Sequence, residues 1–216
     1  MFDEEQEMPM RAQASNLNEE LGQVEYVFSD KTGTLTCNIM EFRKFSAGSR
    51  KYGTDQRPAR PQLENVSFCD PQFDEVLARR AGDADKDALV RCLIFLAACH
   101  TIVIDARKGA YSASSPDELA LVNFAKEYGY NFLERDADDN LIVEVPGGER
   151  LSYKLLSVCE FTSTRKRMSC IFRAPDGEIV MMCKGADSAI SELLSEESKA
   201  SEAFHNIESH VEEFAR

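Results

Sequence analysis

The chain has 216 residues, 43% of them hydrophobic and 9% aromatic, which is enough apolar material for a globular core and argues against disorder. Its formal net charge of −13 disfavours binding to the phosphate backbone of DNA or RNA, so we expect no nucleic-acid partner. The seven cysteines include no C-x-x-C pair, and we interpret them as free thiols in a reducing compartment.

The N-terminal third predicts one helix, three strands and a loop. Residues 16–24 favour a short helix that ends at Gly22. Val24–Phe28 is nearly continuous in apolar character, as a buried parallel strand is, and it leads directly to Asp30. Residues 38–47 are typical of a strand pair, and the Gly, Pro and charge content of 48–62 predicts a surface loop.

The middle of the chain predicts two helices. Apolar residues recur at helical spacing from Asp85 to Cys99, and the run continues to Ile104 as a strand. This run is too short to span a membrane, so we expect the chain by itself to cross none. A second helix is expected to begin after Ser115, because Ser115 and Glu118 fit a capping box around Pro116.

The C-terminal third predicts strands followed by helices. We expect strands over 151–161, 167–174 and 178–185, with the last two joined as a hairpin by the turn Pro175–Gly177. Asp187 is expected to cap a helix, and a last helix is expected to run to Arg216. The predicted fold is α/β, with an inserted domain that contains an antiparallel hairpin flanked by helices.

The string "DKTGTLT", residues 30–36, predicts phosphoryl transfer. A carboxylate at the carboxyl end of a parallel strand lies where α/β folds bind ligands, so Asp30 can attack a γ-phosphate. Lys31 and a Mg²⁺ ion can shield the charge, while Gly33 lets the backbone approach the phosphate. Position 32 is Thr where related phosphatases commonly have a second Asp as general acid, which favours a persistent phosphoenzyme over ester hydrolysis.

Four strings together identify a family resemblance. "NLNEELGQVEYVFSDKTGTLTCNIMEF", "SPDELALV", "EFTSTRKRMS" and "KGAD" resemble the motifs of P-type ATPases, and specifically those of the type IV, phospholipid-transporting branch. The resemblance covers about Asn16 to Arg216. It implies an α+β nucleotide-binding domain inserted in a haloacid-dehalogenase-like phosphorylation domain that is only partly present. The implied divisions are 1–22 as a membrane-proximal lead-in, 23–40 as phosphorylation domain and 41–216 as nucleotide-binding domain.

The resemblance also implies site residues in the phosphorylation loop. Asp30 matches the phosphorylated nucleophile, and Lys31 and Thr32 match positions that contact the nucleotide phosphates. Mg²⁺ is implied at the Asp30 carboxylate and the Thr32 backbone carbonyl. The third Mg²⁺ ligand of the family lies in a Gly-Asp-Gly-x-Asn-Asp motif, which this sequence does not contain.

Four further residues match the ATP site of the inserted domain. Glu118 resembles the acidic residue near adenine, Phe161 the ring that stacks on adenine, and Ser163 and Lys184 further nucleotide contacts. Without the resemblance, a capping Glu, a core Phe and a loop Ser are the ordinary interpretations of the first three. The dense basic sequence Arg165–Arg167 is open to two interpretations, a solvated turn or a patch that steers ATP.

The implied function is that of a segment of an ATP-driven phospholipid translocase. The intact parent is expected in a membrane with this segment facing the cytosol, a phospholipid as substrate of its membrane domain, and possible dependence on an accessory subunit. Three alternatives stay open: a nucleotide-binding module without turnover, a segment of a cation-transporting P-type ATPase, and a soluble phosphatase of the same fold superfamily.

Overall fold

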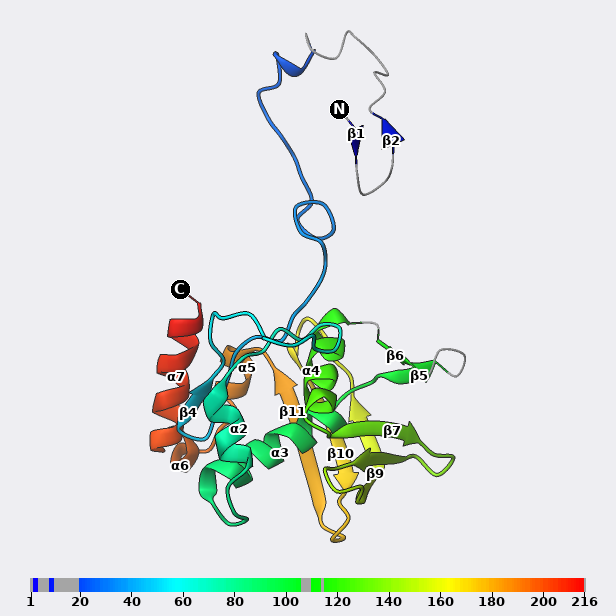
Figure 1. The fold of residues 1–216 in the computed structure, drawn as a ribbon, viewed down its shortest axis with the longest axis vertical. Helices are drawn as coiled ribbons and strands as arrows, with labels where there is room; N and C mark the ends of the chain where they lie inside the picture. Colours follow the sequence, from blue (N-terminus) through cyan, green and yellow to red (C-terminus); the bar gives the residue numbers. More distant parts are fainter. Residues whose placement is uncertain (1, 4–7, 10–19, 106–109, 114, 216) are drawn as a thin grey trace. The chain divides into compact units, whose positions relative to one another are not determined.

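The computed structural model describes residues 2–3, 8–9, 20–105, 110–113 and 115–215 (Figure 1). The chain divides into two compact units, Met1–Asn38 and Ile39–Arg216. The first contains a short antiparallel pair, β1 (Phe2–Asp3) with β2 (Met8–Pro9), and the string 30–36. Among the described residues, no helix is long and apolar enough to cross a membrane.

A five-stranded antiparallel sheet forms one layer of the larger unit. Its order is β11-β10-β9-β8-β7, so every strand pairs with its neighbour in sequence (Figure 1). The strands are β7 (Asn131–Arg135), β8 (Asn140–Glu144), β9 (Arg150–Cys159), β10 (Arg167–Arg173) and β11 (Ile179–Gly185). Alternate residues point to opposite faces of such a sheet, and Leu141, Val143 and Phe172 are buried on the face that carries the core.

Three helices precede the sheet in sequence and form the second layer. They are α2 (Pro71–Leu77), α3 (Ala84–Ala98) and α4 (Pro116–Glu127). The α3 helix packs against α4 and against β7 and β8. Asp70 caps α2 by accepting from the Gln72 amide, and Asp83 caps α3 by accepting from the Lys86 amide. The predicted helix from Asp85 to Cys99 is thus confirmed.

Smaller elements complete the unit. Two hairpins are formed by β3 (Phe45–Ala47) with β4 (Arg50–Tyr52), and by β5 (Val103–Asp105) with β6 (Ala110–Ser112). The C-terminal helices are α5 (Asp187–Ser191), α6 (Glu196–Lys199) and α7 (Glu202–Phe214). The α7 helix docks on the first hairpin through a Ser46–His210 hydrogen bond of 2.8 Å and a Lys51–Glu213 ion pair of 2.5 Å.

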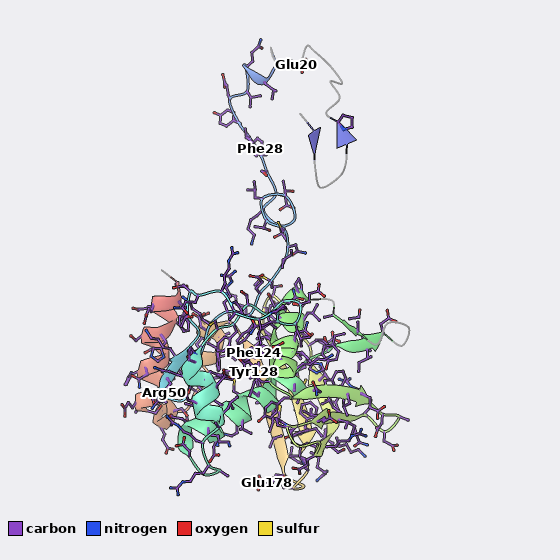
Figure 2. All side chains as sticks on the ribbon, viewed as in Figure 1. Glu20, Phe28, Arg50, Phe124, Tyr128 and Glu178 are labelled. Carbon is purple, nitrogen blue, oxygen red and sulfur yellow. The ribbon has the colours of Figure 1, made fainter. Side chains whose placement is uncertain are left out.

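An aromatic cluster joins the helices to the β3–β4 hairpin. Its rings belong to Phe42, Phe45, Tyr52, Phe68, Phe73, Phe124 and Tyr128. Phe124 and Phe42 are stacked with their ring centroids 3.7 Å apart, and Tyr128, directly after α4, lies 5.3 Å from Phe124 between ring centroids; Figure 2 labels both Phe124 and Tyr128. Aromatic pairs add to the free energy of burial, so this cluster is the main source of cohesion around α4.

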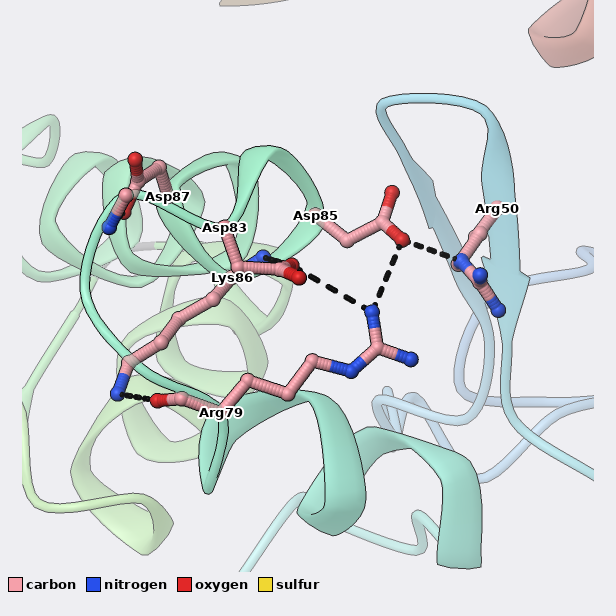
Figure 3. Close-up of polar contacts among 7 residues, drawn as sticks. Arg50, Arg79, Asp83, Asp85, Lys86 and Asp87 are labelled. Atoms are coloured by element: carbon pink, nitrogen blue, oxygen red, sulfur yellow. Dashed lines mark hydrogen bonds and ion pairs between the residues drawn. The ribbon is translucent and has the colours of Figure 1, made fainter.

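Charged side chains connect the same hairpin to α3 and to the segment between α2 and α3. Asp85 accepts from Arg50 at 2.6 Å and from Arg79 at 3.3 Å, while Arg79 also reaches Asp83 at 3.4 Å (Figure 3). These contacts lie at the surface, where an isolated ion pair contributes little to the free energy of folding. Asp85 pairs with both Arg50 and Arg79, so the main effect of the cluster is to hold β4 in its orientation beside α3.

The predicted buried strand over Val24–Phe28 is wrong. Val27 and Phe28 are 84% and 95% exposed, and within the described residues no strand pairs with this segment (Figure 2). A strand is stable only when its backbone groups find partners in a sheet. The five-stranded sheet is built entirely from β7–β11, so the apolar run has no neighbours here.

Other predicted elements are shifted or shortened. The strand pair expected within 38–47 lies at 45–52, so β4 occupies the start of the predicted loop 48–62. Of the helix expected over 16–24, residues 16–19 lie outside the described residues, and within 20–24 only Glu20 and Leu21 are helical. The helix expected to follow Asp187 is a single turn, and Asp187 is not its cap, because that position is Ala186.

Candidate functional site

A cavity of about 700 Å³ opens where β9 ends, β10 begins, β11 ends and α4 begins. Its volume lies in the range of sites for small organic ligands. It is lined by Thr101, Ser115, Asp117, Glu118, Leu121, Glu160, Phe161, Met168, Lys184, Gly185 and Ala186. The lining combines apolar surface with one cationic and three anionic side chains, so it offers both a stacking surface and polar contacts.

An ion pair between Glu118 and Lys184 crosses the wall of this cavity. Lys184 Nζ lies 2.9 Å from Glu118 Oε1, and the residue Glu118 is only 8% exposed. Thr101 donates to the other oxygen, Oε2, from its hydroxyl at 2.8 Å and from its backbone amide at 3.2 Å. Burial raises the pKa of Glu118, but the hydrogen bonds and charge of Lys184 and the donors of Thr101 outweigh it, so the pKa lies below its usual value.

These contacts correct the predicted capping box. Ser115 occupies the N-cap of α4, yet its side chain makes no capping hydrogen bond. Glu118 does not reach back to Ser115, because its two oxygens bond to Thr101 and Lys184. The sequence pattern therefore placed the start of the helix correctly and assigned its acidic side chain the wrong partner.

Gly185 follows Lys184 at the end of β11. A β-carbon at this position would overlap the neighbouring strand, with Lys166 O only 2.5 Å away and Arg167 also too close. The close pairing of Gly185 with Arg167 thus requires glycine and sets where Lys184 emerges.

Phe161 lies at the rim of the cavity with 63% of its surface exposed. The segment before it is held by Arg165, whose Nη1 donates to Cys159 O at 3.0 Å and to Glu160 O at 2.7 Å. Ser163 is exposed on the following turn and is not among the lining residues. The structure therefore brings Glu118, Phe161 and Lys184 together, and it leaves Ser163 outside this group.

The basic sequence Arg165–Arg167 is used mainly to hold its own turn. Arg167 Nη1 donates to Arg165 O at 3.0 Å, and Lys166 adopts a positive φ of 51°. The Lys166 amide and carbonyl bond to Thr162 O and to the Ala186 amide. Both guanidinium groups thus contact backbone carbonyls, which supports the interpretation of a structured turn.

Cys99 and His100 link α3 to the cavity wall. His100 is fully buried, and one ring nitrogen, Nε2, lies 2.9 Å from Ala97 O, while Nδ1 accepts from the Ile102 amide at 3.1 Å. Cys99 Sγ donates to Met182 O at 3.5 Å. Burial lowers the pKa of His100 to about 4, so the ring is neutral at physiological pH.

Acidification is expected to destabilise the larger unit through His100. Its pKa is about 4 when folded and near 6.5 when unfolded, so this stabilisation is full above pH 6.5 and is lost as the pH falls toward 4. The loss at pH 4 is about 3 kcal/mol. Urea unfolding from pH 7 to pH 4 measures it, with the variant His100→Gln showing a flatter dependence. An equally steep dependence in His100→Gln contradicts this account, and the exposed His205→Gln serves as the control.

The string 30–36 forms a closed loop in the smaller unit. The carbonyl of Lys31 accepts from the amides of Leu35 at 3.0 Å and Thr36 at 3.1 Å, and from the Thr36 hydroxyl at 3.3 Å. Gly33 adopts a φ of 82°, which favours glycine even though a β-carbon there would meet nothing within 4 Å. All residues of the string, Asp30 and Thr32 included, are exposed.

Two oxygens of this loop fit a hard cation. The Asp30 carboxylate and the Thr32 carbonyl are the type of donor that Mg²⁺ prefers. Among the described residues, no group of three or more His, Cys, Asp or Glu side chains is placed to hold a metal ion. The Asp30 carboxylate and the Thr32 carbonyl are thus the candidate Mg²⁺ ligands that this loop offers.

Comparison with known proteins identifies the class. The family model for the P-type ATPase cytoplasmic domain N matches residues 87–213, and the chain belongs to the P-type ATPase family. It is 39% identical to phospholipid-transporting ATPase DRS2 of Saccharomyces cerevisiae over 223 residues, which cover 100% of this chain and 16% of that relative. It is 41% identical to human phospholipid-transporting ATPase IC, over 90% of this chain and 16% of the relative.

These relatives confirm the resemblance to the type IV, phospholipid-transporting branch. A third relative, phospholipid-transporting ATPase C887.12 of Schizosaccharomyces pombe, is 39% identical over 98% of this chain and 17% of its own length. The chain thus spans about one sixth of the length of the curated relatives it matches. The mixed architecture of antiparallel sheet and helices agrees with the predicted fold class.

Proposed function

We propose that this chain is the nucleotide-binding and phosphorylation-loop segment of an ATP-driven phospholipid translocase. The observation that carries the proposal is the meeting of Glu118, Phe161 and Lys184 around one cavity, although 43 and 23 positions separate them in sequence. The motif resemblance assigned these same residues to ATP. Their convergence is what a binding site requires and what isolated loop or core roles do not explain.

The electrostatics of the cavity favour binding of the base of ATP rather than its phosphates. Asp117, Glu118 and Glu160 line it against a single cation, Lys184, which already has a carboxylate partner. A triphosphate would be repelled by this lining, whereas an adenine ring is uncharged. The exposed ring of Phe161 supplies the stacking surface. Ser163, on the adjacent turn, is proposed to contact the nucleotide outside the cavity.

Asp30 is the nucleophile in the proposed reaction. Its carboxylate oxygen bonds to the γ-phosphorus of ATP, the bond from that phosphorus to the β–γ bridging oxygen breaks, and ADP leaves. Lys31 and Thr32 contact the phosphates, and Mg²⁺ held by the Asp30 carboxylate and the Thr32 carbonyl shields their charge. In the intact parent, lipid arrival triggers hydrolysis of the aspartyl phosphate and moves the lipid toward the cytosolic leaflet.

The parent protein is proposed to lie in a membrane with this segment facing the cytosol. Its proposed substrate is a phospholipid, bound by a membrane domain of the parent, and its proposed partner is an accessory subunit. By itself, the 216-residue chain is proposed to bind nucleotide without turnover. The exposed segment 24–28 supports this second statement, because within the described residues no strand pairs with it to form a sheet that would position Asp30.

Replacing Phe161 with alanine is expected to weaken ATP binding by the chain. Loss of base stacking costs about 1–3 kcal/mol, which is roughly a 5- to 150-fold increase in Kd. Isothermal titration calorimetry with ATP measures the change. Leu156→Ala, which removes an exposed apolar side chain from β9 outside the cavity lining, is the matched control and is expected to bind like the unmodified chain. If Phe161→Ala and the unmodified chain bind ATP with equal affinity, the assignment of the Phe161 ring to the ATP site is wrong.

A further inference from the structure

Residues 99–102, between α3 and β5, form a fixed segment beside the cavity. Cys99 bonds to the carbonyl of Met182 on β11, and both ring nitrogens of His100 are engaged by backbone groups. Ile102 is 2% exposed. Thr101 is therefore the exposed residue between two buried anchors, and its backbone has little freedom to move away from the cavity wall.

Thr101 directs two donors at one carboxylate oxygen. Its hydroxyl and its amide both reach Glu118 Oε2, at 2.8 and 3.2 Å, while Lys184 Nζ holds Oε1 at 2.9 Å. The Glu118 side chain of α4 is thus held by three donors, two from Thr101 and one from Lys184. Hydrogen bonds to a charged acceptor are stronger than neutral ones, so the hydroxyl contributes substantially to this restraint.

We propose that Thr101 is a positioning residue of the nucleotide site, which holds the Glu118 carboxylate, and through it Lys184, in the orientation that the ligand meets. This inference deepens the proposed function and depends on it. Thr101 lines the cavity together with both partners, which a residue that merely satisfies a buried carboxylate need not do. Nothing in its sequence context marks it, because an exposed threonine in a loop is ordinary.

The test uses Thr101→Val, which removes the hydroxyl and keeps the shape and the amide. We expect about a tenfold increase in the Kd for ATP, measured by calorimetry, and recovery to within about twofold in Thr101→Ser. In a chain that already carries Glu118→Ala, adding Thr101→Val is expected to change the Kd less than about twofold, because there is no carboxylate left to hold. Thr54→Val removes a hydroxyl that bonds to Cys69 O, outside the cavity lining, and is the matched control.

A second measurement needs no nucleotide. Carbon-13 NMR of the Glu118 carboxyl group in the ATP-free chain is expected to show a higher titration midpoint in Thr101→Val, because one donor that favours the charged form is lost. If the unmodified chain binds no ATP, the proposed function fails, and this titration still decides whether Thr101 holds Glu118. The inference is overturned if Thr101→Val leaves the midpoint unchanged, or if it weakens ATP binding equally with and without Glu118.

Discussion

The substitution Asp30→Asn (numbered as in this chain), made in the full-length parent protein, is expected to abolish the acid-stable phosphoenzyme. The amide has nearly the shape of the carboxylate but lacks the nucleophilic oxygen that forms the acyl phosphate. Within the smaller unit, the loop is held by the carbonyl of Lys31 and the hydroxyl of Thr36, neither of which the substitution touches. The change is therefore expected to remove chemistry without removing the loop.

Labelling with γ-³²P-ATP, followed by acid quench and gel electrophoresis, measures this loss. Asp138→Asn, at an exposed aspartate in the turn between β7 and β8, is the matched control and is expected to label like the unmodified parent. ATP affinity of Asp30→Asn, measured in parallel, separates lost chemistry from lost binding. Persistent acid-stable label on Asp30→Asn would show that another residue is the nucleophile.

Truncation of Phe124 to alanine is expected to lower the free energy of unfolding of the larger unit by about 3–5 kcal/mol. Phe124 is fully buried, stacks on Phe42 and meets Phe68 edge-on with centroids 5.0 Å apart. Its removal leaves a cavity at the centre of the aromatic cluster, and neighbouring rings cannot all move in to fill it. The matching fall in Tm is about 10 °C for a unit of this size.

Urea and thermal unfolding of the 216-residue chain measure this effect, and Phe161→Ala is its matched control. Phe161 is exposed, so its truncation is expected to change the free energy of unfolding by less than about 0.5 kcal/mol. The two substitutions thus separate a ring that holds the fold from a ring that holds ligand. A stability loss in Phe161→Ala comparable to that in Phe124→Ala would contradict the assignment of Phe161 to the rim of the cavity.

Local signals in the sequence located several elements correctly. The helical spacing after Asp85 and the turn Pro175–Gly177 each specify structure within a few residues, and both were confirmed. The segment 24–28 failed because its apolar pattern describes a strand inside a sheet, and pairing is not a local property. The strands β7 and β8 were missed because the charged stretch 134–139, which includes the end of β7, and the glycines 147–148 that follow β8 are typical of loops.

The candidate site could be predicted only in part. The resemblance named Glu118, Phe161 and Lys184, and the fold brings these three residues to the lining of one cavity. The ordinary interpretation of Glu118 as a capping residue came from local spacing and was wrong, because tertiary contacts with Thr101 and Lys184 compete for its oxygens. No local pattern could reveal Thr101, because its proposed role depends on tertiary hydrogen bonds from the segment after α3 to Glu118 on α4.

The central claim is that this cavity binds the base of ATP, and NMR titration of the isotopically labelled 216-residue chain with Mg²⁺-ATP tests it most directly. We predict saturable shifts at Phe161, Lys184 and Glu118, with resonances of the α7 helix unchanged. GTP at equal concentration controls for the charge of the nucleotide. Absence of saturable shifts, or shifts confined to residues outside the cavity, would contradict the account.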